Sequence, residues 1–117
     1  MEKNGLVMND EAFREMVRVL EGAIQAGVES VGLEYKDGDL LVFYQRGQMG
    51  FGAGSIRQDL QQAVIEGIVK RAGLERKSRG KIPATLLGVA YEVMVEEYDS
   101  FGQSAFTLTW KKAKNAK

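Results

Sequence analysis

The chain has 117 residues, of which 44% are hydrophobic and 27% charged, a composition typical of one compact domain. Its 16 basic and 16 acidic side chains balance, which argues against nucleic acid or an anionic lipid surface as a partner. The sequence contains neither cysteine nor histidine, so disulfides, thiolate nucleophiles, histidine-based triads and histidine-ligated metals are excluded. We therefore expect a non-catalytic protein with no cofactor and no metal site.

The sequence also lacks the features of a membrane or secreted protein. No apolar run is long enough to span a bilayer, and the first residues lack the apolar core of a signal peptide. We expect a cytoplasmic protein with one domain over residues 1–117. Its ordered part is expected from about residue 8 to residue 111, followed by a flexible basic tail over 112–117.

The first element that the sequence predicts is a helix. It is expected to begin near residue 8, with Asn9 or Asp10 as its cap, and to stop at Gly27. The apolar residues with the spacing of one helix face are Phe13, Met16, Val17, Leu20 and Ile24.

Two stretches in which apolar and polar residues alternate predict β-hairpins. The first covers residues 31–45, with Asp37 and Gly38 as its tight turn. The second covers residues 91–112, with the turn-rich segment 99–104 between its strands. Three aromatic residues at strand spacing are expected to pack in the core or across the hairpin, with a surface patch as the alternative: Tyr91, Phe106 and Trp110.

Between the hairpins the sequence predicts a second helix, with Ser55 as its cap and Gly73 at its end. Its apolar stripe consists of Ile56, Leu60, Val64, Ile65, Ile68 and Val69. Residues 74–88 contain Pro83, the only proline, and are expected to form an ordered but irregular connection.

The predicted order is helix, hairpin, helix, hairpin (αββαββ). Two helices on one face of a four-stranded, mainly antiparallel sheet bury the apolar faces of all these elements, which gives an α+β two-layer sandwich. Residues 19–30 and 64–76 also resemble each other, either because the halves are a duplication or because both segments are amphipathic helices. Gly22 and Gly67, inside the helices, indicate either close helix–sheet contact or surface positions.

A glycine-rich segment over residues 47–54 is the first candidate site. Glycines let a backbone approach a ligand, and the amides of a helix N-terminus bind phosphate, so a phosphate or another small anion is one expectation. The residues that would bind it are Gly50, Gly52, Gly54 and Ser55. The segment matches neither GxGxxG nor GxxxxGK[ST], and the alternative is a plain crossover from strand to helix.

A basic cluster is the second candidate site. Its six cations are Lys70, Arg71, Arg76, Lys77, Arg79 and Lys81. They are opposed within the segment by Glu75 alone, and they are expected to face phosphates or an acidic partner. No aromatic residue is interleaved with them, which argues against nucleic acid. The alternative is a solvated helix end whose cations suit the helix dipole.

Four carboxylates near the second hairpin, Glu92, Glu96, Glu97 and Asp99, are the remaining candidates for chemistry. Glu92 and Glu96 share the strand face opposite the apolar residues, so we expect them in solvent rather than in a desolvated catalytic site. The spacing of the four residues does not match a metal-binding loop.

Three stretches carry a resemblance to a known family: GVESVGLEYKDGDLLVFYQRG, IVKRAGLERKSRGKIP and YEVMVEEYDSFGQSAFTLTW. From about Val19 to Trp110 the chain resembles the domain that precedes the motor domain in type II secretion and type IV pilus assembly ATPases. The residues that fit the family pattern are Lys70, Ala72, Gly73, Leu74, Pro83 and Gly102, with Glu75 where the family has aspartate. The family's Asp-Ile-His signature is replaced here by Val31, Gly32 and Leu33 or their neighbours.

The resemblance implies a domain that acts with an ATPase. In the family, arginines of this domain contact nucleotide held by the motor; here only Arg46, Arg79 and Lys81 lie near those positions. The chain contains no phosphate-binding motif of a motor domain. We therefore expect an interaction or regulatory domain that binds an ATPase or an assembly component through Arg46, the basic cluster and the glycine-rich segment 47–54. A small-anion or nucleotide-binding domain and a homodimer joined through a sheet edge are the alternatives.

Overall fold

The computed structural model of the chain describes residues 10–114. Its elements in chain order are α1 (Asp10–Ala26), β1 (Ser30–Lys36), β2 (Asp39–Arg46), β3 (Met49–Ser55), the short 3-10 helix η2 (Gln58–Leu60), α2 (Gln61–Ala72), β4 (Arg79–Leu86), β5 (Val89–Ser100) and β6 (Gln103–Lys112). The predicted cap at Asn9 and the last three residues of the predicted tail lie outside the described residues. The tail was expected from residue 112, which is instead the last residue of β6.

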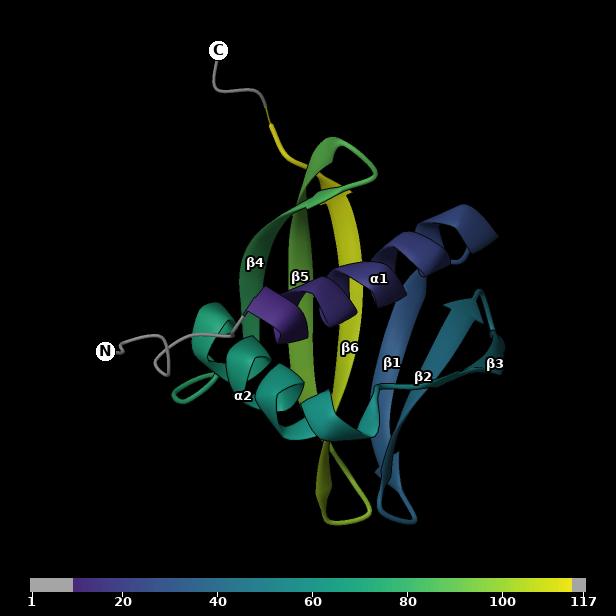
Figure 1. Cartoon of the computed structure of the whole chain (residues 1–117), viewed down its shortest axis with the longest axis vertical. Helices are drawn as coiled ribbons and strands as arrows, with labels where there is room; N and C mark the ends of the chain where they lie inside the picture. Colours follow the sequence, from purple (N-terminus) through teal and green to yellow (C-terminus); the bar gives the residue numbers. More distant parts are fainter. Residues whose placement is uncertain (1–9, 115–117) are drawn as a thin grey trace.

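The predicted α+β sandwich is confirmed, but its sheet has six strands rather than four. The strand order is β3-β2-β1-β6-β5-β4, and every neighbouring pair is antiparallel. Both helices lie on the same face of this sheet (Figure 1). Each predicted hairpin is therefore part of a three-stranded meander, and β1 and β6 join the two meanders at the centre of the sheet.

The first additional strand is β3, in the segment that was expected to be a loop. It pairs with β2 through Arg46 opposite Met49 and Tyr44 opposite Phe51, with a bulge beyond Phe43. Every residue of β3 is exposed. Glycine disfavours strands, and β3 has no alternation of buried and exposed residues. The sequence pattern therefore did not predict β3.

The second additional strand is β4, where an irregular connection was expected. It forms the opposite edge of the sheet and pairs along its full length with β5. Pro83 lies opposite Glu92 within it; an edge strand tolerates proline because one side of its backbone has no partner strand. The period-two pattern of Ile82, Ala84 and Leu86, all buried, was the signal for this strand.

The core lies between the helices and one face of the sheet. Across the centre, Val31 is opposite Leu108 and Leu33 is opposite Phe106, and all four side chains are buried. The predicted apolar stripes of both helices face this core, with members that are buried or packed against it. Of the three aromatic residues predicted there, Phe106 is fully buried and Tyr91 and Trp110 are partly buried against it.

The chain crosses from β3 back to the sheet's other edge through η2 and α2. The helix was expected from Ser55, but Ser55 ends β3 and α2 begins at Gln61. The buried side chain of Gln61 donates to Asp39 Oδ1 (2.6 Å) and to the Ile56 carbonyl (3.0 Å). Side-chain hydrogen bonds therefore hold this crossover, and Ile56 is buried although it precedes the helix.

Glycine allows close contact between each helix and the sheet. A Cβ atom at Gly22 of α1 would lie 2.7 Å from the hydroxyl oxygen of Tyr44 on β2, which confirms the predicted close approach. Gly67 of α2 is buried. The tightest contact is between Gly80 on β4 and the end of α2, where a Cβ would overlap the carbonyl oxygen of Ala72. Helix α2 thus rests directly on the backbone of β4.

The two halves of the chain are not arranged as a simple repeat. The first half enters the sheet at the central strand β1 and moves outward, whereas the second half enters at the edge strand β4 and moves inward. β1 and β4 also run in opposite directions, because three antiparallel pairings separate them. A rotation that reversed the strand directions and kept the strand order would move the helices to the opposite face, yet both helices lie on one face (Figure 1). No rotation or translation therefore superposes one half on the other. The sequence likeness of residues 19–30 and 64–76 does not extend to the direction of the strands that follow.

Replacing Gly80 tests the contact between α2 and β4. In Gly80→Ala the new Cβ overlaps the Ala72 carbonyl oxygen, so the helix end must move away from the strand. We expect urea denaturation to show a free energy of unfolding lower by about 1–3 kcal/mol, the usual cost of overpacking. Gly52→Ala on β3 is the matched control, because a Cβ there meets no atom within 4 Å. Equal losses in the two variants would contradict this account of Gly80.

A buried carboxylate between α1 and the crossover makes stability depend on pH. Glu15 is 5% exposed; it accepts hydrogen bonds from the Arg18 guanidinium (2.7 and 3.0 Å) and from the backbone N–H of Arg57 (3.1 Å). The hydrogen bonds from Arg18 contribute most to lowering the pKa of Glu15, against the opposing effect of burial. A lowered folded-state pKa stabilises the protein above the unfolded-state pKa, and this stabilisation is lost as the pH falls through the folded-state value.

We therefore expect Glu15→Gln to be less stable than the wild type at about pH 7, and this difference to shrink at about pH 3. Urea denaturation at both pH values measures it. Glu75→Gln, at an exposed position, is the control and should behave as the wild type at both. A stability difference for Glu15→Gln that is independent of pH would show that the carboxylate is not the source.

Candidate functional site

The candidate site is built on the end of helix α2. Gly73 follows the helix with the left-handed φ of 70°, and its N–H donates to the Lys70 carbonyl (3.3 Å). The N–H of Leu74 donates to the Val69 carbonyl (2.8 Å), and the Leu74 side chain is buried. These bonds satisfy carbonyls at the helix end and anchor the turn toward β4. The cations on either side of the turn are therefore held on ordered backbone.

A hollow of about 520 Å³ lies between this helix end and the edge strand β4. Five of the six cations of the predicted basic cluster line it: Lys70, Arg71, Lys77, Arg79 and Lys81. We call it the basic hollow. The lining is completed by Ala72, Gly73 and Gly80, which have little or no side chain, and by Met94 on β5. Residues from a helix, a turn and a strand thus surround one concave surface.

Carboxylates neutralise only part of this charge. The Nε atom of Arg79 lies 3.6 Å from Glu96, and the Nζ atom of Lys81 lies 3.8 Å from Glu92. Within residues 10–114, the cations of Lys70, Arg71 and Lys77 form no ion pair. The basic hollow therefore keeps an excess of positive charge on a molecule of zero net charge.

Arg71 has a defined position within the hollow. Its guanidinium carbon lies 4.5 Å from the centre of the Phe13 ring on α1, a distance typical of a cation–π contact. This contact orients the side chain without neutralising it. Arg71 therefore links α1 to the basic hollow while its charge stays available to an anion.

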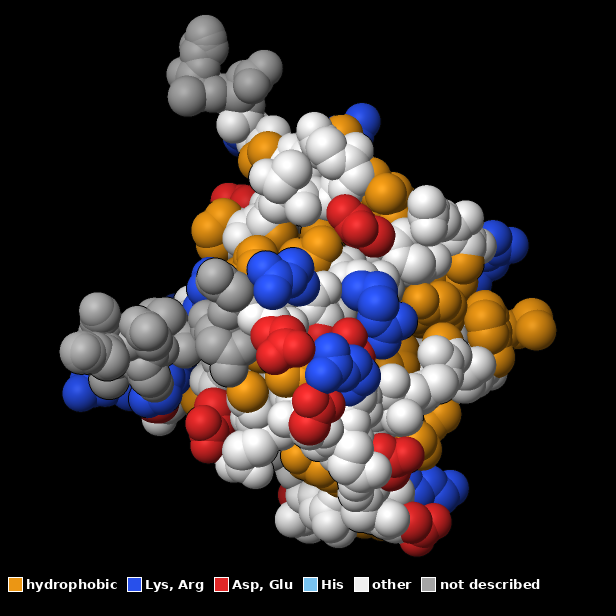
Figure 2. All heavy atoms as spheres, in the orientation of Figure 1, with side chains coloured by type: hydrophobic (Ala, Val, Ile, Leu, Met, Phe, Trp, Pro, Cys, Tyr) orange, Lys and Arg blue, Asp and Glu red, His pale blue; other side chains and the backbone are white. Residues whose placement is uncertain are grey.

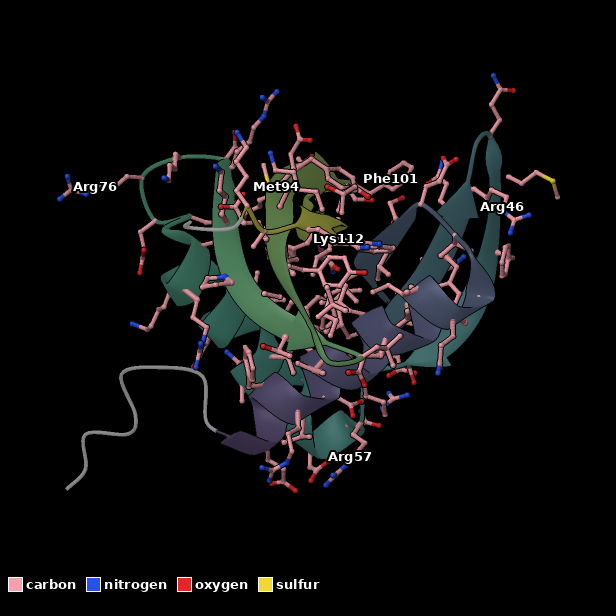
Figure 3. All side chains as sticks on the ribbon, turned by 90° about the horizontal axis from the view of Figure 1, so that it is seen from above. Arg46, Arg57, Arg76, Met94, Phe101 and Lys112 are labelled. Carbon is pink, nitrogen blue, oxygen red and sulfur yellow. The ribbon has the colours of Figure 1, made fainter. Side chains whose placement is uncertain are left out.

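Two of the predicted partner-binding arginines lie apart from the basic hollow. The guanidinium of Arg46 donates to the Gly27 carbonyl (3.0 and 3.1 Å), where it holds the end of α1. Arg76 lies with Glu97 and Asp99 around a neighbouring hollow. Figure 3 shows Arg46 and Arg76 on opposite sides of the molecule, so no single contact surface of modest size includes both.

The predicted small-anion site has a different backbone from the one expected. Gly50, Gly52, Gly54 and Ser55 lie in the exposed strand β3, and five residues separate Ser55 from the first residue of α2. The helix N-terminal amides are therefore not adjacent to these glycines. Anion binding at this strand stays a prediction, which amide chemical shifts of residues 50–55 on addition of inorganic phosphate would test.

The four carboxylates considered for chemistry have structural partners. Glu92 and Glu96 lie on the sheet face opposite the core, as expected, in the ion pairs with β4 described above. The carboxylate of Glu97 accepts from the Ser104 hydroxyl (2.7 Å), and that of Asp99 from the N–H of Gly102 in the β5–β6 turn (3.3 Å). Their arrangement supports strand pairing and a tight turn.

A smaller hollow of about 340 Å³ adjoins the basic hollow on the uncovered face of the sheet. It shares Arg79, Gly80 and Met94 with the basic hollow and adds the hydroxyl side chains of Thr107 and Thr109 on β6. Sequence reasoning missed Met94 and the two threonines. Their alternation with buried Val93, Val95 and Leu108 was the available signal, since it places them on the face away from the core.

Other kinds of site find no support in the part of the chain that the structure describes. Between residues 10 and 114, no three acidic side chains are grouped closely enough to hold a metal ion. No helix in that range is both long and apolar enough to cross a membrane. The basic hollow is therefore the candidate that charge and shape favour together.

Comparison of the chain with protein-family models and with curated proteins finds no match.

Proposed function

We propose that this chain is a non-catalytic interaction or regulatory domain that binds an acidic surface of a protein partner in the basic hollow. The observation that carries the proposal is the excess charge there: five cations line one concave surface, and carboxylates pair with two of them. Clustered cations of this kind raise the rate and the specificity of association with an acidic surface.

The resemblance to the domain that precedes the motor in secretion and pilus ATPases supports a choice of partner. On that basis the partner is such an ATPase or another component of its assembly. Three cations lie near the positions of the family's nucleotide-contacting arginines. Arg79 and Lys81 line the basic hollow, whereas the guanidinium of Arg46 is bonded to the backbone at the end of α1. A role at the partner's nucleotide would therefore fall to the first two rather than to Arg46.

Reversing charge inside the hollow tests this function. We expect Lys70→Glu/Lys77→Glu to weaken partner binding on the order of tenfold or more, since unfavourable charge pairs replace favourable ones. Affinity capture from a lysate of the source cell first identifies a secretion or pilus ATPase as the partner. Titration of that purified ATPase against the wild type and the variant then measures the dissociation constants. Both lysines are exposed, so the thermal midpoint should stay near that of the wild type.

The matched control is Lys36→Glu/Arg76→Glu, which makes the same change in net charge at exposed positions outside the hollow. It should bind the partner as the wild type does. Equal loss in both double variants would assign the effect to net charge, and unchanged binding in Lys70→Glu/Lys77→Glu would contradict the proposed surface.

Releasing the paired cations should have the opposite effect. In Glu92→Gln/Glu96→Gln, Lys81 and Arg79 lose their carboxylate partners, so the positive potential of the hollow rises. We expect several-fold tighter binding of a glutamate-rich peptide at low salt, and a steeper loss of binding as salt is added. Fluorescence anisotropy of the labelled peptide measures both. Unchanged affinity would show that these carboxylates do not modulate the site.

A further inference from the structure

The two edge strands of the sheet differ in whether they carry residues that prevent pairing with another strand. The β4 edge carries two cations, Arg79 and Lys81, together with Pro83, which has no N–H to offer another strand. Charged side chains and proline are the usual means by which proteins prevent another strand from adding to an edge. The β3 edge, MGFGAGS, carries neither. One edge is thus blocked, and the other is open.

The open edge also exposes apolar side chains. Met49 is 72% exposed and Phe51 is 49% exposed. Phe51 lies opposite Tyr44, with ring centroids 6.1 Å apart in an edge-to-face contact, and Tyr44 itself bonds to the Val19 carbonyl of α1 (3.3 Å). Met49 and Phe51 therefore lie on the helix-covered face, at its border. Figure 2 shows hydrophobic side chains gathered at this edge of the molecule.

We propose that β3 pairs antiparallel with β3 of a second copy of this chain, so that two six-stranded sheets form one continuous sheet. The strand is uncharged, so its self-pairing brings no like charges together. Its side chains alternate, with Met49 and Phe51 on the helix side and Gly50 and Gly52 on the other. When a two-fold axis relates two copies of β3, the apolar side chains of both copies lie on one face of the joined sheet and the glycines of both lie on the other. A self-complementary interface requires this match.

The pairing has a definite geometry. In an antiparallel ladder, directly opposite residues lie on the same face, so a two-fold axis through Phe51 places the two Phe51 side chains together and Met49 opposite Ala53 of the second copy. The bulge and the positive φ of Gly54 bend the end of β3, which confines the ladder to residues 49–53. Such a short ladder makes a weak dimer, whose population depends on concentration.

Sedimentation velocity of the full chain, from micromolar to millimolar concentration, tests the proposal. We expect a monomer at the lowest concentration and a dimer at the highest. Phe51→Lys and Phe51→Asp should each remain monomeric, because each places two like charges across the two-fold axis. An equimolar mixture of the two variants should form the dimer again, because the charges are then opposite. Thr85→Lys, an exposed position on the β4 edge, should dimerise as the wild type does.

The proposal is overturned by a wild type that stays monomeric at millimolar concentration, by dimers that persist in both Phe51 variants, or by a variant mixture that remains monomeric. Circular dichroism establishes that each variant is folded. Amide hydrogen exchange of wild-type residues 49–53 gives a readout without mutation: exchange should slow as the concentration rises, and exchange independent of concentration in a dimeric sample would place the interface elsewhere. None of these outcomes depends on the basic hollow, which lies at the opposite edge.

Discussion

The pairing of β1 with β6 is the constraint on which the rest of this molecule depends. It is the one ladder between the two meanders, and it joins residues 31–34 to residues 105–108. Its apolar pairs, Val31 with Leu108 and Leu33 with Phe106, are buried beneath the helices. Because β6 takes the central place, β4 is left at the edge, and α2 must cross the sheet to deliver the chain there (Figure 1).

The basic hollow is a consequence of that crossing. Helix α2 ends directly on β4, where Gly80 leaves room for the carbonyl of Ala72. The last turn of the helix and the first residues of the strand both carry cations, which suit a helix end and an exposed sheet edge separately. The fold sets these two ordinary features side by side, and their combined charge exceeds what the carboxylates of β5 can pair.

Sequence patterning predicted the parts of the fold that rest on local signals. The stripe of α1, the turn at Asp37 and Gly38, and the pairing of β5 with β6 follow from periodicity and turn chemistry. Neither edge strand was predicted from the sequence. Strand β3 is stabilised by pairing with β2 rather than by burial, so it has no alternating pattern. In β4 the cations and the proline obscured the alternation of buried residues. Five of the six cations of the predicted basic cluster line the basic hollow, but nothing local in the sequence separates Arg76 from Lys77.

The central place of the last strand also governs when the molecule can fold. During synthesis α1, β1, β2 and β3 leave the ribosome first, yet one side of β1 has no partner until residues 105–108 arrive. Until then the N–H and C=O groups along that side of β1 have no partner strand, a situation that favours association with other chains. Contacts between distant parts of a chain also slow folding. Without β6 the two meanders have no strand to join them, so the N-terminal half alone cannot form the six-stranded sheet.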